Sequence, residues 1–228
     1  MAACLGLPAS AMAADIIAPV PAKAPVAPRV VSWTGVYAGV HGGGAWSKWT
    51  GIDPTDPTAV WTSTTAGGGL VGGQIGGNYQ VGQVVVGLEG TGAWSSVTVN
   101  AGGPFAGGAG FTLSLRGDYI ASVGGRLGLA FDGVLLYAKG GAAFTRDKYS
   151  GNDGLGGTVS GSFNRSGWLA GGGVEWMFMP SWSVRAEYNY MGFGTLTEQL
   201  TTTGNLAATP ANVKLNVQTG TIGLNYHF

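Results

Sequence analysis

The fold is decided by residues 167–190, which read GWLAGGGVEWMFMPSWSVRAEYNY. Two runs of alternating residues lie on either side of Met179-Pro180-Ser181, and alternation with period two is typical of a β-strand with two different faces. In the second run the apolar residues occupy one face and the polar residues the other: Trp182, Val184, Ala186, Tyr188 and Tyr190 alternate with Arg185, Glu187 and Asn189. This stretch therefore predicts an antiparallel hairpin with one apolar face.

The same alternation recurs from Trp33 to Phe228, with turn-forming residues between the runs. It predicts strands at residues 33–46, 68–79, 83–96, 113–131, 134–146, 164–178, 182–194 and 214–228. The connections alternate in length: three are tight, at 80–82, 132–133 and 179–181, and four are long, at 47–67, 97–112, 147–163 and 195–213. Short periplasmic turns and long outer loops are typical of outer-membrane barrels.

The composition indicates a surface that water does not cover. Charged residues make up 10% of the 228, against about a quarter in soluble domains, and 44 residues are glycine. Eleven basic residues balance eleven acidic ones. This balance argues against nucleic acid as a partner, because binding a polyanion needs a basic surplus.

Two other architectures fit the sequence less well. The longest charge-free stretch, residues 57–88, is rich in Gly, Thr, Gln and Asn and does not suit a transmembrane helix. A soluble lipocalin-like barrel would need many charged side chains outside, whereas the polar face here holds mostly small residues and suits a narrow lumen. The sequence therefore predicts an all-β fold, an eight-stranded antiparallel up-and-down transmembrane β-barrel, in the bacterial cell outer membrane.

Aromatic residues on the apolar face are spaced as the two girdles of such a barrel. Trp168 and Trp176 lie eight residues apart, and eight residues of a tilted strand rise about 20 Å. We expect the periplasmic girdle to contain Tyr79, Phe131, Trp176, Phe178, Trp182, Tyr226 and Phe228. We expect the outer girdle to contain Trp46, Trp94, Tyr119, Phe144, Trp168 and Tyr190.

Six charged residues share the inward face and are expected at one depth in the lumen: Glu89, Arg126, Lys139, Glu175, Arg185 and Glu187. Buried charges persist when they are paired, so three acids and three bases predict a plug of salt bridges. A gated ion path is the alternative. With Pro180 at the centre of its turn, Glu175 lies opposite Arg185, and their side chains are expected to meet. The inward glycines are expected to leave voids that trap water: Gly87, Gly124, Gly128, Gly141, Gly171 and Gly173.

The first residues resemble the end of an export signal. Ala11-Met12-Ala13 forms an A-x-A cleavage box, so residues 1–14 are interpreted as a partial signal peptide that lacks its positive start. Cys4 lies in this segment, and a lipoprotein cysteine is the alternative. Residues 15–32 contain four prolines and predict an extended Pro/Ala-rich periplasmic linker, which leaves residues 33–228 for the barrel.

Three segments resemble the opacity-like porin family, the outer-membrane immunogenic proteins of alphaproteobacteria. They are WTGVYAG at 33–39, the hairpin from GRLGLAFD to LYAKGG within 125–141, and GLNYHF at 223–228. The resemblance implies an eight-stranded barrel related to the membrane domain of outer-membrane protein A. It also implies a terminal aromatic residue, Phe228, that the barrel-assembly machinery recognises. It does not imply one activity, because members are described as structural, adhesive, immunogenic or haem-binding.

No catalytic or metal-binding motif can be assembled from the sequence, so we expect no enzyme, no cofactor and no metal. His41 is interpreted as a girdle or loop-edge histidine, with haem or metal ligation as the alternative. The loop acids are interpreted as solvated, with calcium binding as the alternative: Asp53, Asp56, Asp147 and Asp153.

Three functions are consistent with these features. The sequence favours a structural, surface-exposed outer-membrane barrel, and the alternatives are a small-solute channel and a loop-mediated binder of haem or host surfaces. The expected partners are outer-membrane lipid and lipopolysaccharide, and the barrel-assembly machinery through the C-terminal strand. The oligomeric state is not predicted.

Overall fold

The computed structural model describes residues 31–52, 60–104, 110–152, 158–198 and 211–228. The strands are β1 (Gly35–Ile52), β2 (Val60–Val81), β3 (Val84–Ser95), β4 (Thr98–Pro104), β5 (Gly110–Phe131), β6 (Val134–Asn152), β7 (Thr158–Met179), β8 (Trp182–Glu198) and β9 (Ala211–His227). Within these ranges no helix is long and apolar enough to cross a membrane. The predicted signal peptide and most of the linker, residues 1–30, lie outside the described residues.

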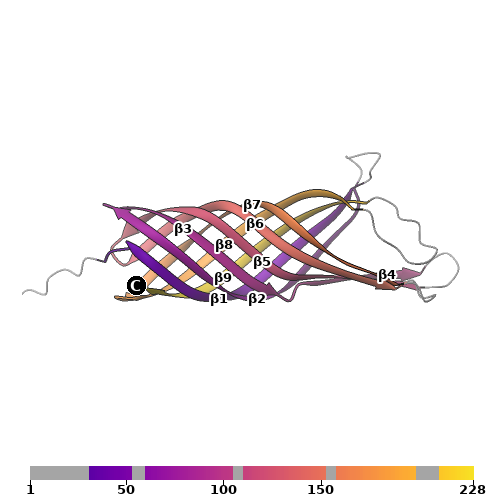
Figure 1. The fold of residues 1–228 in the computed structure, drawn as a ribbon, viewed down its shortest axis with the longest axis horizontal. Helices are drawn as coiled ribbons and strands as arrows, with labels where there is room; N and C mark the ends of the chain where they lie inside the picture. The colour runs from indigo at the N-terminus through magenta and orange to yellow at the C-terminus, as the bar shows by residue number, and fades with distance from the viewer. Residues whose placement is uncertain (1–30, 53–59, 105–109, 153–157, 199–210) are drawn as a thin grey trace, which may run out of the picture. The chain divides into compact units, whose positions relative to one another are not determined.

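The strands close into an antiparallel barrel (Figure 1). Apart from β3 and β4, strands that follow one another along the chain pair with each other, and β1 pairs with β9, as is needed to join the two ends of the sheet. β3 and β4 occupy one position in the barrel, because both pair with β5 and only Ser96 and Val97 separate them. The predicted eight-stranded antiparallel barrel is confirmed.

The tight connections lie at Gly82–Gln83, Asp132–Gly133 and Pro180–Ser181. The last two agree with the prediction, and the first lies slightly later in the chain than predicted. Gly82 and Asp132 have φ angles of 61° and 51°. Both angles lie in the left-handed region that the commonest two-residue hairpin turns use, and Gly adopts this region freely while Asp tolerates it.

The strands extend further toward the long connections than predicted. β6 ends at Asn152, beyond the expected residue 146, and β7 begins at Thr158, before the expected residue 164. In this extension Ser150 pairs with both Ser114 and Ser160. Strand pairing uses backbone groups, so it continues past the point where the alternation of apolar and polar side chains ends.

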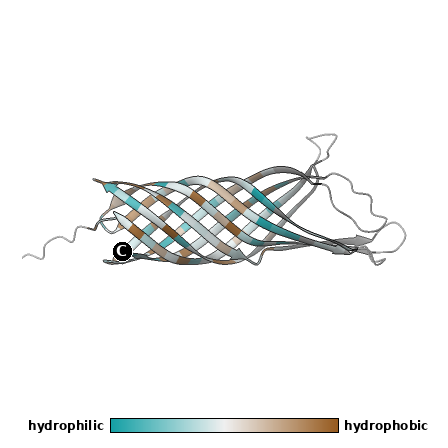
Figure 2. Ribbon diagram, viewed as in Figure 1, coloured by the Kyte–Doolittle hydropathy of each residue, from teal (hydrophilic) through white to brown (hydrophobic). Residues whose placement is uncertain are grey.

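Hydrophobic and hydrophilic residues alternate along the strands (Figure 2), and the burial of the side chains shows that the apolar face points outward and the polar face into the lumen. Outward residues such as Leu88 and Ile222 are exposed in the isolated barrel, with 70% and 67% of their surface accessible. The six charged residues that the sequence assigns to the lumen are at most 5% exposed. This arrangement is the reverse of a soluble barrel and fits a lipid-facing wall.

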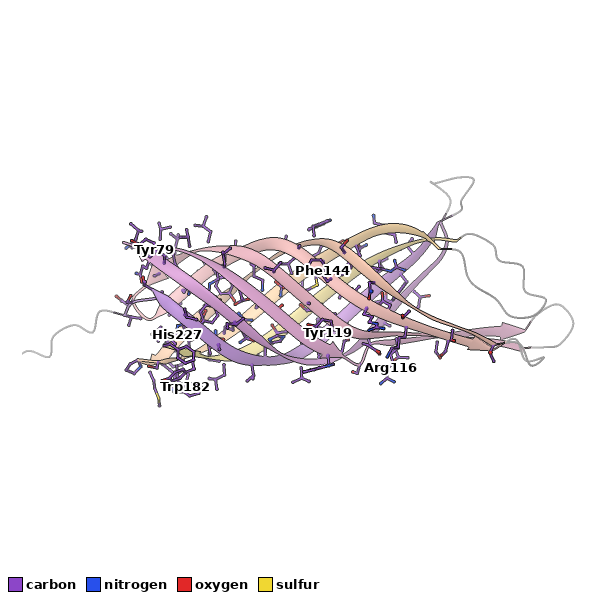
Figure 3. All side chains as sticks on the ribbon, viewed as in Figure 1. Tyr79, Arg116, Tyr119, Phe144, Trp182 and His227 are labelled. Atoms are coloured by element: carbon purple, nitrogen blue, oxygen red, sulfur yellow. The ribbon has the colours of Figure 1, made fainter. Side chains whose placement is uncertain are left out.

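The predicted interface aromatics lie on the outward face. Figure 3 shows Tyr79 and Trp182 toward the end with the tight turns, and Tyr119 and Phe144 nearer the long connections. Several neighbouring rings contact each other: the centroids of Trp182 and Tyr226 are 5.1 Å apart, and those of Trp168 and Tyr190 are 5.4 Å apart. Their role at the membrane interfaces stays a prediction.

Candidate functional site in the lumen

The lumen contains a cluster of six charged side chains, here called the ion cluster: Glu89, Arg126, Lys139, Glu175, Arg185 and Glu187. They come from β3, β5, β6, β7 and β8. The tight hairpins set their common depth, because the register places Arg126 opposite Lys139 and Glu175 opposite Arg185. Three carboxylates and three cations meet in one buried space.

All three cations of the ion cluster lie close to Glu89. Its carboxylate lies 2.9 Å from Lys139 Nζ and 3.7 Å from Arg126 Nη1. It also accepts hydrogen bonds from the guanidinium of Arg185 and, at 2.7 Å, from the Tyr37 hydroxyl. A carboxylate removed from water is stable when cations and hydrogen-bond donors surround it in this way.

Glu187 completes the same group from the other side. Its carboxylate lies 2.8 Å from Lys139 Nζ and 3.6 Å from Arg185 Nη1. The Tyr137 hydroxyl donates a hydrogen bond to it at 2.6 Å, and Asn189 Nδ2 donates another at 2.8 Å. Lys139 therefore bridges two carboxylates that stand on different strands.

Glu175 forms the part of the ion cluster nearest the tight turns. Arg126 Nη2 lies 3.1 Å from Glu175 Oε2, and Asn225 Nδ2 donates to Oε1 at 2.7 Å. The Ser183 hydroxyl also donates to Oε1, and His227 Nε2 lies 3.4 Å from the same oxygen. These partners hold a carboxylate that has no exposed surface.

Arg126 lies between two tyrosine rings. Its guanidinium carbon is 4.8 Å from the ring centroids of both Tyr37 and Tyr137, within the range of cation–π attraction. Arg126 Nε also donates to Asn78 Oδ1 at 2.9 Å. Neither tyrosine was predicted as a lumen residue, although the inward parity of both, opposite to that of the girdle aromatics, was a usable signal.

Apolar side chains fill the lumen on both sides of the ion cluster. The layer near the tight turns contains Trp33, Val85, Ala130, Leu135 and Tyr137. The layer near the long connections contains Ile120, Ala143, Leu169, Met191, Phe193, Leu215 and Val217. These layers were not predicted from the sequence, because no strand contributes more than three of these apolar residues to its polar face.

The inward glycines do not leave the expected voids. A Cβ at Gly173 would lie 2.5 Å from the carbonyl oxygen of Ala186 and 2.9 Å from the Tyr137 hydroxyl. A Cβ at each of the others would also approach a neighbour more closely than 3.0 Å: Gly87, Gly124, Gly128, Gly141 and Gly171. Neighbouring strands and lumen side chains occupy the space, so these positions have no room for a side chain.

The predicted register is observed, but the predicted side-chain pair is wrong. Glu175 and Arg185 are Cα partners, yet Glu175 binds Arg126, and Arg185 binds Glu89 and Glu187. Long side chains reach across the lumen to strands that are not adjacent. Cross-strand register alone therefore does not identify the ion-pair partner.

Two further placements from the sequence are corrected. His41 lies inside the lumen, where its Nδ1 contacts Gln74 Oε1, and not at a girdle or loop edge. Asp147 is buried rather than solvated, with Oδ2 lying 3.6 Å from Arg165 Nε. Asp53, Asp56 and Asp153 lie outside the described residues. Among the residues that the structure describes, no group of three or more His, Cys, Asp or Glu side chains could hold a metal.

Comparison with known proteins agrees with this architecture. The family model of the outer membrane protein beta-barrel domain matches residues 2–228. The 31 kDa outer-membrane immunogenic protein of Brucella melitensis biotype 1 is 32% identical over 233 residues, which cover 96% of this chain and 94% of that protein. The 25 kDa outer-membrane immunogenic protein of Brucella canis is 31% identical over 230 residues, covering 100% of this chain and 95% of that protein.

One solved structure extends the comparison to the fold. The outer membrane protease OmpT of Escherichia coli has a TM-score of 0.53 and 10% sequence identity, and the match covers 86% of this chain and 98% of that chain. At this identity the similarity concerns the fold alone.

Proposed function

The chain belongs to the family of outer-membrane protein beta-barrel domains, is related to outer-membrane immunogenic proteins, and is on that premise an outer-membrane protein; we propose that it is a structural barrel with a closed lumen and surface-exposed loops. The observation that carries this proposal is the ion cluster, which crosses the lumen between two apolar layers. An ion would have to pass all three layers. Neither apolar layer would replace its hydration shell.

The space left in the lumen supports closure. A cavity beside the ion cluster, between His41, Thr91 and Arg185, has a volume of about 20 Å³. A second cavity nearer the long connections, beside Trp49 and Asp147, has a volume of about 10 Å³. Volumes of this size hold about one water molecule each, and side chains generally fill the interior of an eight-stranded barrel.

A small-solute channel is the second candidate, and one observation favours it. Three buried nitrogens in or beside the ion cluster make no hydrogen bond within the described part of the chain: Asn78 Nδ2, Arg126 Nη1 and Arg185 Nε. Buried donors that make no hydrogen bond are frequently hydrated. A chain of such waters would be the start of a conduction path.

The relatives support the surface-exposed part of the proposal. Both Brucella proteins are named as outer-membrane immunogenic proteins, and an immunogenic membrane protein presents segments that antibodies can reach. We assign this role to the long connections between the extended strands. No catalytic activity belongs to this proposal, and binding of haem or host surfaces by these connections stays a prediction.

Planar-bilayer recording tests the closed lumen directly. The folded full-length chain is incorporated into a bilayer and compared with the same detergent without protein. We expect, at most, small and infrequent current steps. Steady conductance of porin size from the unmodified protein would contradict the closed barrel and support the channel.

A further inference from the structure

The charges on the outward face of the barrel are distributed unevenly. Between the two predicted girdles, the described outward-facing residues include no charged side chain. Beyond the outer girdle, five cations point outward on the extended strands: Lys48, Arg116, Arg146, Lys148 and Lys214. Three of these stand together on β5 and β6, because the register pairs Arg116 with Lys148 and Tyr119 with Arg146.

A bulge in β5 assembles these three cations. The pairing of β5 with β6 shifts between Gly117 and Tyr119, and the extra residue, Asp118, lies between two of them. Asp118 Oδ2 is 2.6 Å from Lys148 Nζ, and Oδ1 is 3.7 Å from Arg116 Nε. Both cations nevertheless remain more than half exposed, at 57% and 66% of their side-chain surface.

Arg146 has no such partner. No carboxylate within the described ranges forms an ion pair with its exposed guanidinium. Three cations and one carboxylate therefore leave a net charge of +2 on this part of the surface, here called the outer-rim basic site: Arg116, Asp118, Arg146 and Lys148. The surplus positive charge has no counter-charge among the described residues.

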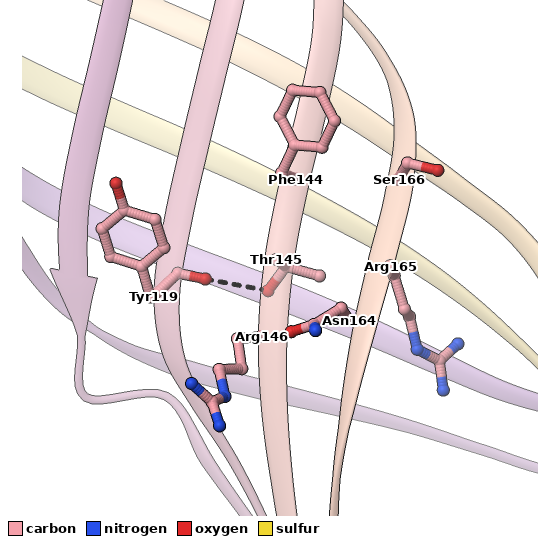
Figure 4. A pocket seen from close by; sticks show the side chains of 7 residues that line it. All are labelled: Tyr119, Phe144, Thr145, Arg146, Asn164, Arg165 and Ser166. Carbon is pink, nitrogen blue, oxygen red and sulfur yellow. Dashed lines mark hydrogen bonds between the residues drawn. The ribbon is translucent and has the colours of Figure 1, made fainter.

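A groove of about 420 Å³ lies beside this site, between β5, β6 and β7 (Figure 4). Phe144 and Tyr119 line it from the girdle, and Arg146, Asn164 and Ser166 add polar groups. In Figure 4 Phe144 and Ser166 lie at one end of the groove, and Arg146 and Asn164 lie toward the other. One end of the groove is therefore formed by the Phe144 ring with the Ser166 hydroxyl, and the other end by the cationic Arg146 with the Asn164 amide.

The depth of the site identifies the class of ligand. Girdle aromatics lie at the boundary between acyl chains and head groups. Arg146 and Lys148 are two and four residues beyond Phe144, which is about 5–10 Å along the barrel axis for a tilted strand. This places the cations at the level of lipid head groups, and guanidinium and ammonium groups bind phosphate well.

We propose that the outer-rim basic site binds the phosphate groups of an outer-leaflet glycolipid of the lipid A type, with the groove receiving the adjoining part of the lipid. Arg146 is the main phosphate ligand, because its guanidinium has no carboxylate partner. Arg116 and Lys148 add charge in an orientation that Asp118 fixes. The outer-rim basic site lies outside the lumen, so this proposal does not depend on whether the barrel conducts ions.

Lipid retention by the full-length protein tests this proposal. The chain is folded into neutral phosphatidylcholine vesicles containing bisphosphorylated lipid A, extracted in neutral detergent, and the lipid A bound per protein is counted by native mass spectrometry. We expect the unmodified protein to retain lipid A, and affinity to fall about fivefold for each cation removed, as for basic residues near anionic membranes. The variants are R116Q, R146Q and K148Q, singly and together.

A matched control separates this site from general surface charge. K48Q with K214Q removes two outward cations at the same rim on β1 and β9, on another part of the barrel wall, and is expected to retain lipid A. Heat-modifiable gel migration checks that each variant is folded. If the triple variant does not fold, the test uses R146Q and R146K instead, and R146K is expected to retain part of the bound lipid A.

The outcomes are decisive in both directions. Loss of retention in the triple variant or in R146Q, together with weak retention of dephosphorylated lipid A by the unmodified protein, supports the site. Equal retention by unmodified and variant proteins, or equal losses in the control, overturns it. Displacement of lipid A by millimolar inorganic phosphate would also overturn it, because it would show a simple anion site and not a lipid site.

Discussion

Arg185 on β8 donates a hydrogen bond across the lumen to Glu89 on β3, 96 residues earlier in the chain. The two strands are separated by β9, β1 and β2 in the closed sheet, so this contact joins opposite walls of the barrel. The remaining ion pairs join walls that are closer together, such as Lys139 on β6 to Glu89 on β3. The ion cluster therefore links opposite walls of the barrel.

Removing the charge of Glu89 is expected to destabilise the barrel. E89Q leaves Lys139 and Arg185 each with one carboxylate fewer, and breaking a buried pair costs about 3–5 kcal/mol. Urea unfolding in lipid vesicles, followed by gel migration, measures the change in the free energy of unfolding. D132N at an exposed tight turn is the control, and a loss no greater than that of D132N would contradict the role of Glu89.

Double-mutant cycles are expected to distinguish contact from register. The coupling energy between E89Q and R185M should exceed the coupling between E175Q and R185M, because Arg185 contacts Glu89 whereas Glu175 is only its Cα partner. The four unfolding free energies of each cycle give the two couplings. The reverse order would mean that adjacent-strand pairing, and not the cross-lumen contact, dominates.

Alanine at Gly173 is expected to destabilise the barrel by about 1–3 kcal/mol, the cost typical of overpacking. Its Cβ would meet the Ala186 carbonyl and the Tyr137 hydroxyl. G140A is the matched control on the outward face, where a Cβ would lie 3.8 Å from the nearest atom. Stabilisation by G173A, measured by the same unfolding assay, would show that the inward glycine leaves a void after all.

Neutralising part of the ion cluster is expected to make current steps more frequent in planar bilayers. E89Q combined with R126M removes one charge of each sign and detaches the guanidinium from Glu175 and Asn78. Adding F193A, which thins the apolar layer near the long connections, should increase the step size further. The control D132N should give current steps as rarely as the unmodified protein does. If the double variant E89Q/R126M also gives no more current steps than the unmodified protein, the ion cluster does not close the lumen.

Removing Tyr226–Phe228 is expected to abolish insertion into the outer membrane. This segment pairs with β1 and β8, and Phe228 N donates to the carbonyl of Val36 at 3.0 Å, so its loss opens the seam at the periplasmic rim. The measurement is the amount of protease-resistant, heat-modifiable barrel in outer-membrane fractions. Y79F, a change at an exposed girdle position, is the control, and normal barrel levels in the truncated form would refute the prediction.

The sequence by itself determined the number of strands, the direction of their faces and the register at Pro180. Each of these depends on local information: a side-chain period of two and the length of a tight turn. The same local rule assigned Glu89, Arg126 and Lys139 to the lumen. Applied to Tyr37 and Tyr137, it would have placed both inward, although their contacts with Arg126 could not be read from it.

Only the tertiary structure decided which groups meet. Arg185 bypasses its cross-strand neighbour Glu175 for Glu89, because barrel closure brings β8 and β3 to opposite sides of one narrow lumen. Gly173 leaves no void in the lumen, because a backbone carbonyl of β8 and the hydroxyl of Tyr137 occupy the space where a Cβ would be. The alternation of residues along a strand determines whether a side chain points into the lumen or outward. The partners of that side chain depend on how the sheet curves and closes, and every strand contributes to that closure.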